Sequence, residues 1–523
     1  MDYAILVNKL KNQGLAPLKV MENCSNEVYL EVSPEHWLAT ATFLHEQLRS
    51  PVMALFALDE RARQQHFLVT AAFVGLAYRK WFFLTLKIPA AQPSFPSMAT
   101  KIYSANLFER EIREMFGLEP QGNPDHRRLN LHEEVWPEGF YPLRKDFDKH
   151  LVSGEKGSYR FAKVEGEGIF EVPVGPVHAG IIGPGHFRFG VAGEPIINLD
   201  IRLGFTHRGV EKTFEGKRPE EGLLLSECVA GDSAFAHSWS FCRAMEKISG
   251  LSIPERALSL RAIFLELERM SNHLADLAGI ALDVGFSFPA AYASLVKEAL
   301  HTLNQQLTGS RYLKGTDTIG GVLKDLTEEK QTLLLSSLKV ILADFNEIKN
   351  ILSTSTSFMD RVETTGILRR KTAEDFGVVG LVGRASGLAL DFRQNTPPYK
   401  AAGFKMVTGK EGDVLARLNV RLGEFEESVR LIKELINHLP VGEIIASSPE
   451  IKAGQALGCI EGWRGPVLYW VKTNETGIID RCKIVDPSFH NWPGLSYAVL
   501  DNIIPDFPVC NKSFNLSYAG NDL

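Results

Sequence analysis

Apolar residues follow one pattern in the first 150 residues and another in the rest of the chain. Residues 27–32, 67–70 and 81–86 are short runs rich in valine, leucine and aromatic side chains, which are typical of partly buried strands. A helical pattern precedes them, and residues 91–97, which contain two prolines, predict a loop. The first part is therefore predicted to be a small α+β domain.

A charged helix is predicted over residues 104–117. Leu107, Ile112 and Met115 place an apolar stripe along it, and Gly117 stands where a helix commonly ends. Most other positions are charged, and spacing alone favours a solvated helix whose charges pair with one another. Residues 154–157 are the predicted linker to the second domain.

The second domain is predicted to begin with β structure. Residues 186–191 and 196–201 alternate between apolar and other side chains around a turn at residues 192–194, which predicts an antiparallel hairpin.

Three long helices are predicted after this hairpin. The first follows a capping-box pattern, Ser252 with Glu255 three residues later. Its buried face is predicted to hold Leu260, Phe264, Leu267, Ser271 and Leu274. Glu266 can pair with Arg269 on another face, and a packed role is favoured for His273. Further helices over residues 333–352 and 416–439 complete the pattern of a helical bundle.

Composition narrows the class of protein. The chain has 523 residues, of which 45% are hydrophobic and 23% charged, as in folded proteins of several domains. A net charge of -6 gives no basic footprint, so nucleic acid is not an expected partner.

The cysteines and the apolar runs indicate a location. Six cysteines lack a disulfide rhythm, and the first residues do not resemble a signal peptide, so we expect a cytosolic, reducing environment. Charges interrupt the apolar stretches 66–89 and 376–392, so no transmembrane helix is expected.

The motifs of the first domain resemble a known family. The blocks 104–117, 123–128 and 141–147 occur in the same order as in the 30-kDa subunit of respiratory complex I and its counterparts in energy-converting hydrogenases. The resemblance implies a docking domain over residues 1–155.

The rest of the chain, residues 156–523, resembles the complex I 49-kDa subunit and the large subunit of formate hydrogenlyase-type hydrogenases. The resemblance is carried by residues 175–189, 204–212, 228–246, 266–274 and 380–393. It implies a mainly α-helical bundle with antiparallel β additions, as in nickel-iron hydrogenase large subunits.

Four positions depart from the hydrogenase pattern. Where those proteins carry two C-x-x-C pairs on nickel, this chain has Ala230, Ser233, Ser488 and Asn491. A nickel-iron centre needs four soft thiolate ligands, which these side chains do not supply. Rescue by the nearby Cys228, Cys242 and Cys482 is disfavoured, since buried reduced thiols are the ordinary case. We therefore expect no metal or other cofactor on this chain.

The resemblance also suggests which polar residues line a central cavity. They are His178, Arg208, Glu211, His237, Arg384 and Asp391. Glu211, charged beside Arg208, could change its pKa with redox state and feed a proton path. A buried structural ion pair would explain Arg384 and Asp391 equally well.

The family implies a subunit on the cytoplasmic face of the membrane, within an oxidoreductase that moves ions. Its expected partners are a subunit with a 4Fe-4S cluster, membrane-embedded complex I-like subunits, and a ferredoxin-, formate- or NADH-oxidising module. One alternative is a quinone-reducing module, which Ile182 and Gly231 disfavour because they replace a loop histidine and a quinone-binding tyrosine. The other is a non-catalytic assembly scaffold. Hydrogenase activity itself ranks last.

Overall fold

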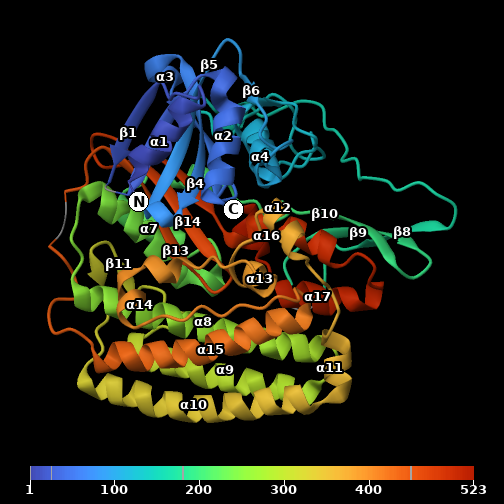
Figure 1. The fold of residues 1–523 in the computed structure, drawn as a ribbon, viewed down its shortest axis with the longest axis vertical. Coiled ribbons are helices and arrows are strands. Elements are labelled where there is room, and N and C mark those ends of the chain that lie inside the picture. Colours follow the sequence, from blue (N-terminus) through green and yellow to red (C-terminus); the bar gives the residue numbers. More distant parts are fainter. Residues whose placement is uncertain (1, 25, 180–181, 448–449) are drawn as a thin grey trace.

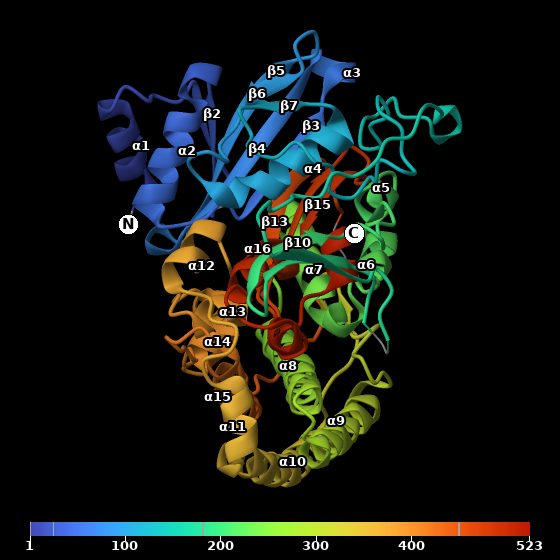
Figure 2. The same ribbon diagram turned by 90° about the vertical axis from the view of Figure 1, so that its right-hand side faces the viewer.

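The computed structural model describes residues 2–24, 26–179, 182–447 and 450–523. Its N-terminal part is built around a sheet, and its C-terminal region is mainly helical (Figure 1). Figure 2 shows the sheet at one end of the molecule and the long helices at the other. The boundary between residues 155 and 156 stays a prediction.

A mixed five-stranded sheet forms the N-terminal part, in the order β1-β2-β5-β4-β3. β2 pairs in parallel with β5, and the other neighbours are antiparallel. All three predicted strand runs lie in this sheet. The elements of this region are α1 (Tyr3–Asn12), β1 (Lys19–Asn23), β2 (Glu27–Val32), α2 (Pro34–Leu48), β3 (Ala54–Asp59), α3 (Arg61–Gln64), β4 (His66–Gly75), η1 (Leu76–Tyr78) and β5 (Lys80–Pro89).

The predicted loop over residues 91–97 was only partly right. It contains β6 (Ser94–Pro96), which pairs in parallel with β7 (Glu119–Gln121). The partner strand is distant in sequence, so the local pattern of prolines gave no sign of this pairing.

The charged helix is α4 (Asn106–Phe116), and Gly117 ends it in the left-handed conformation with φ 67°. The expectation that it is solvated was wrong, because Glu109, Glu111 and Glu114 are all buried. Loops wrap around it and bring polar groups to its charges. The neighbouring short helices are η2 (Tyr103–Ala105) and η3 (Lys149–Leu151).

The predicted hairpin is confirmed: β9 (His186–Ala192) and β10 (Ile196–Arg202) are antiparallel, and β8 (Ile169–Val174) adds a third strand. A second three-stranded antiparallel sheet is formed by β13 (Gly454–Glu461), β14 (Pro466–Thr473) and β15 (Ile479–Val485). β11 (Asp317–Thr318) and β12 (Gly321–Val322) form a small pair.

Four long helices dominate the C-terminal region: α8 (Glu255–Asp283), α9 (Ser287–Thr308), α10 (Glu328–Thr354) and α15 (Val414–Asn437). α8 is buried on nearly all sides and packs on α9 and α15. The capping box was wrong, because Pro254 is the N-cap and makes no side-chain cap.

Shorter helices connect these elements. They are α5 (Val210–Phe214), α6 (Pro219–Ser226), η4 (Gly231–Ser233), α7 (Ala234–Ser249), α11 (Thr356–Val362), α12 (Arg370–Phe376), α13 (Gly380–Ala385), η5 (Phe392–Asn395), α14 (Pro397–Ala401), α16 (Pro487–Ala498), η6 (Ile504–Asp506), α17 (Phe507–Phe514) and α18 (Tyr518–Asp522).

The N-terminal sheet does not complete its core alone. Its hydrophobic cluster includes residues from β13, β14 and α16, and the ring of Phe56 lies 4.8 Å from that of Trp470. Tyr29 accepts a hydrogen bond from the Trp470 indole at 3.0 Å. The two parts of the chain are therefore packed together through a shared apolar layer. In the described part of the chain, no helix has the length and apolarity needed to cross a membrane.

Candidate functional site

The four positions that carry cysteine in hydrogenases, Ala230, Ser233, Ser488 and Asn491, are called here the ligand-equivalent positions. They lie on two segments, one leading into α7 and the other beginning α16. Arg464 lies between the segments: its Nη1 donates to Ser233 Oγ at 3.3 Å, and the adjoining Gly465 packs against Pro487. The fold therefore brings together two segments that are far apart in sequence.

The side chains at these positions are engaged in structural hydrogen bonds. Ser488 Oγ accepts from the backbone of Ser517 at 2.9 Å, and Asn491 Oδ1 accepts from the Val379 amide at 2.9 Å. Ser233 Oγ accepts from the indole of Trp463 at 3.0 Å. Ala230 has no donor atom. These residues do not fit the thiolate set of a nickel-iron centre.

Nearby cysteines do not replace that set. Cys242 and Cys482 are buried, and burial raises the pKa of both thiols well above the usual value. Cys228 is exposed, which corrects the expectation that all three are buried. Over the described ranges, no three His, Cys, Asp or Glu side chains are grouped as a metal site.

An ion pair lies where the two segments meet. The Arg464 guanidinium contacts both carboxylate oxygens of Asp232, at 2.8 and 2.6 Å, and stacks over the Trp463 ring at 3.8 Å. The predicted cavity residues did not include this pair. Its partners are 232 residues apart, so neither can be found from local spacing.

A cavity of about 700 Å³ opens beside this pair and is called here the central cavity. Its wall includes Ala230, Asp232, Glu268 and Arg464. Val174, His178, Ile182, Gly183 and Phe187 also line it, as do several residues between 507 and 519. Of the six predicted cavity residues, His178 lines it, and its Nε2 lies 2.7 Å from the Gly185 carbonyl oxygen.

Glu268 is another acidic residue of this wall that sequence reasoning missed. Its carboxyl oxygens accept from the first amides of α7, Phe235 N at 2.7 Å and Ala236 N at 3.1 Å. Burial nevertheless raises the pKa of Glu268 to about 8. The sequence did contain a signal for Glu268. Burying an acidic side chain on a helix that is buried on all sides is costly in free energy unless the side chain has a partner.

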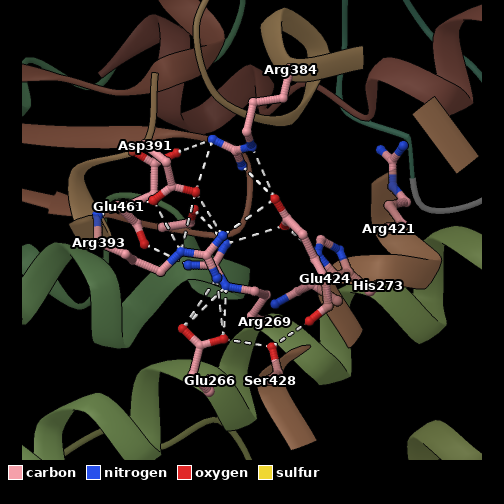
Figure 3. Close-up of polar contacts among 12 residues, drawn as sticks. Glu266, Arg269, His273, Arg384, Asp391, Arg393, Arg421, Glu424, Ser428 and Glu461 are labelled. Carbon is pink, nitrogen blue, oxygen red and sulfur yellow. Dashed lines mark hydrogen bonds and ion pairs between the residues drawn. The ribbon is translucent and has the colours of Figure 1, made fainter. Parts of the chain in front are cut away.

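Arg384 and Asp391 belong to a separate buried charge network (Figure 3). Arg384 contacts Asp391 at 3.3 Å, Glu424 at 2.7 Å and Glu461 at 2.7 Å. Side chains from α8, α13, α15 and the end of β13 point toward one another in the figure. The charge network consists of Glu266, Arg269, His273, Arg384, Asp391, Arg393, Glu424 and Glu461.

The charge network contains one more carboxyl group than guanidinium groups. Its four carboxylates outnumber its three guanidinium groups, so full ionisation leaves an excess negative charge that is costly when buried. Burial lowers the pKa of His273. Burial and the adjacent Asp391 raise the pKa of Glu461 to about 7. Glu461 is thus the carboxyl group of the network whose pKa is raised toward neutral pH.

Residues 461–464 connect the charge network to the central cavity, since Glu461 belongs to the network and Arg464 lines the cavity. Glu461 and Gly462 accept hydrogen bonds from Arg269 at 2.7 and 2.9 Å through their carbonyls. The next two residues, Trp463 and Arg464, bind Ser233 and Asp232 at the cavity wall. A group in the cavity that changes its charge is therefore separated from the charge network by one short segment of chain.

Glu211 and Arg208 do not form the predicted pair. Glu211 binds Arg481 at 2.7 Å and Lys483 at 3.1 Å, and Lys483 also holds Glu111 of α4. Arg208 donates instead to the carbonyls of Cys228, Val229 and Ala519. β15 presents two cations to Glu211, whereas Arg208 faces the C-terminal tail.

His237 lies in a third buried group. Its Nδ1 is 2.9 Å from Tyr469 Oη, and its Nε2 is 3.2 Å from Asp486 Oδ2. Of the six predicted residues, His178 lies on the cavity wall, Arg208 is exposed and the other four lie in buried polar groups. Their proposed roles remain predictions.

Comparisons with known proteins identify relatives across most of the chain. Residues 30–151 match the family model described as the 30 Kd subunit of respiratory-chain NADH dehydrogenase, and residues 283–453 match the 49 Kd subunit. Formate hydrogenlyase subunit 5 of Escherichia coli is 32% identical over 493 residues, which cover 92% of this chain and 86% of that protein.

Two further relatives show the range of the similarity. Hydrogenase-4 component G of Escherichia coli is 31% identical, covering 92% of this chain and 85% of its own length. The C/D subunit of NADH-quinone oxidoreductase from Phocaeicola vulgatus is 30% identical, covering 72% of this chain and 76% of its own length.

Proposed function

Because the chain belongs to the family that joins complex I-type 30-kDa and 49-kDa domains, shared by hydrogenase and NADH-quinone oxidoreductase subunits, we propose a coupling role for it. In this role it is a peripheral subunit on the cytoplasmic face of a membrane-bound oxidoreductase. It would link electron transfer in a partner iron-sulfur subunit to ion translocation by membrane-embedded subunits. A ferredoxin-, formate- or NADH-oxidising module would supply the electrons.

We further propose that this subunit works without a nickel-iron site of its own. The chemistry of the ligand-equivalent positions supports this, since Ala230 has no donor and the other three side chains are engaged in structural hydrogen bonds. Measuring metals in the purified chain tests the proposal. Stoichiometric nickel would overturn it, and substoichiometric traces would agree with it.

The observation that carries the coupling role is the link between the central cavity and the charge network. The partner's 4Fe-4S cluster would supply the electron beside the cavity. A negative charge there raises the proton affinity of nearby carboxyl groups. Glu268, with a pKa of about 8, and Glu461, with a pKa of about 7, are placed to respond near neutral pH. In this mechanism they take up a proton on reduction and release it on reoxidation.

The test uses the intact complex in sealed vesicles. Glu461→Gln and Glu268→Gln are expected to lower the number of ions moved per electron while electron transfer continues. Glu374→Gln, at an exposed pair with Arg370, is the matched control. An unchanged ratio in both variants would contradict the role. Glu211→Gln tests the sequence-based expectation in the same assay.

Quinone reduction is a second candidate, favoured by the apolar part of the central cavity. The cavity is lined by the apolar residues Phe187, Phe507 and Leu516 together with His178. The exposed Ile182 also lines it. Turnover with a soluble quinone, abolished by a cavity-filling Ala230→Trp variant, would support this candidate. If turnover with the natural partners survives Asp232→Asn, Arg464→Gln and this blocking variant, while Leu267→Asp abolishes assembly, the scaffold role is favoured instead.

A further inference from the structure

A second cavity, of about 710 Å³, lies on the junction between the N-terminal sheet and the C-terminal region. It is called here the junction cleft. Its walls are formed by the β4–β5 turn, by α7 with β13, and by residues 392–401 around η5 and α14. No described residue lines both this cleft and the central cavity.

The junction cleft is strongly cationic. Five of its lining residues are basic: Arg79, Lys80, Arg243, Lys247 and Lys400. No aspartate or glutamate is found among the described residues that line it. Outside the cleft, Glu22 pairs with Lys80 and Glu27 pairs with Lys247. These two carboxylates neutralise only part of the positive charge.

Three of the cations lack a carboxylate partner within the described ranges. Arg243 Nη1 donates to the Cys459 carbonyl at 2.9 Å, which carries no net charge. Arg79 and Lys400 form no ion pair with any described residue. Together they leave three positive charges around one recess.

The fold holds two of the cations in place by a close helix-strand contact. Gly458 on β13 allows it, since a Cβ there would lie 1.8 Å from the Ser240 carbonyl oxygen of α7. Arg243 and Lys247 are one turn apart on α7, a spacing at which like charges repel. Burial lowers the pKa of both side chains. An anion in the cleft would relieve this repulsion.

We propose that the junction cleft binds a small polyphosphate, either free or as the phosphate chain of a nucleotide. A recess of this size suits a compact ligand better than an extended chain. Guanidinium groups bind phosphate oxygens in pairs, and ammonium groups add point charges. Asn26, Gln394, Asn395 and Thr396 supply further polar groups, and Trp81, stacked on Phe392 with ring centroids 5.6 Å apart, forms an apolar wall.

Calorimetric titration of the full chain with inorganic pyrophosphate and with ATP, at constant ionic strength, tests this site. Saturable binding is expected for at least one of them. The variants to compare are Arg79→Gln with Lys400→Gln, because both residues are free of ion-pair partners among the described residues. This double variant should weaken binding at least about tenfold, the loss expected when charge-assisted contacts are removed.

The matched control is Arg63→Gln with Lys410→Gln, two exposed cations outside the cleft. It should bind as the unchanged chain does. Stronger binding of ATP than of pyrophosphate would identify a nucleotide, and equal binding would identify the phosphate chain alone. Absence of saturable binding, or equal losses in the double variant and the control, would overturn the proposal. Binding of an acidic peptide, without binding of pyrophosphate or ATP, would also overturn the proposal.

Discussion

Glu114 and Arg110 on α4 are satisfied by other partners than Glu266 and Arg269 on α8. On α4, Glu114 accepts from the amides of Leu129, Asn130 and Leu131, and Arg110 donates to the carbonyls of Arg127 and Arg128. On α8, Glu266 and Arg269 bind each other and further charged groups of the charge network. The first arrangement fixes loops, whereas the second ties the protonation of each group to that of its neighbours.

The largest effect is expected from Glu424→Leu in the charge network. This change removes the carboxylate that Arg384, Arg393 and Arg269 all contact, and leaves their guanidinium groups without that buried partner. We expect a loss of about 3–5 kcal/mol in the free energy of unfolding, the range for removing one partner of a buried pair. Urea unfolding measures it, and hydrogen exchange should increase in α8, α13 and η5 together. A loss below about 1 kcal/mol would mean that the charges are not interdependent.

Glu114→Gln on α4 should have a smaller and more local effect. The amide retains one acceptor oxygen but loses the charge that strengthens three backbone hydrogen bonds. We expect a loss of about 1.5–3 kcal/mol, as for hydrogen bonds to charged groups. Faster hydrogen exchange should be confined to residues 129–131 and their neighbours. If hydrogen exchange also became faster in α8, the two helices would not differ in how they respond to the loss of a buried charge.

Glu268→Gln should change the pH dependence of stability. The folded pKa of about 8 exceeds the reference value of 4.5, so below pH 4.5 the group is protonated in both states. As pH rises from 4.5 to 8, the unfolded state loses the proton first, and the folded state loses stability. The variant lacks this contribution, so its melting temperature relative to the unchanged chain should rise between pH 5 and pH 9. A constant difference would contradict the raised pKa.

The smallest effect is expected on the surface. Arg370 and Glu374 pair at 2.9 Å, with 65% and 44% of their side chains exposed. Arg370→Gln should change stability by no more than about 0.5 kcal/mol. The same urea titration gives the baseline for the variants of Glu424 and Glu114. A larger loss of stability in Arg370→Gln would show that exposure alone does not separate weak ion pairs from strong ones.

Local patterns predicted local structure well. The strand at residues 27–32, the end of α4 at Gly117 and the hairpin of β9 and β10 depend on residues close in sequence. The burial of α4 could not be predicted in this way, because its charges are satisfied by loops up to 18 residues away and by Lys483, 372 residues away.

In the candidate site too, local motifs could be predicted from the sequence and long-range contacts could not. Sequence motifs located Arg384, Asp391 and the ligand-equivalent positions, but the contacts that define their surroundings join distant segments. Arg464 reaches Asp232 across 232 residues, and the position of Glu268 at the start of α7 depends on helix packing. The pairing of Glu211 with Arg208 was wrong for this reason: nearness in sequence was taken for contact, whereas β15 supplies the cations.

The apolar layer shared by the N-terminal sheet and β13–β15 has a consequence for biosynthesis. Tyr29 leaves the ribosome 441 residues before Trp470, against which it and Phe56 pack. Until then the sheet has an uncovered apolar face, and contacts of such long sequence separation form slowly. The nascent chain is therefore exposed to aggregation during most of its synthesis. A truncated N-terminal fragment would keep that face uncovered and should bind chaperones far longer than the whole chain does.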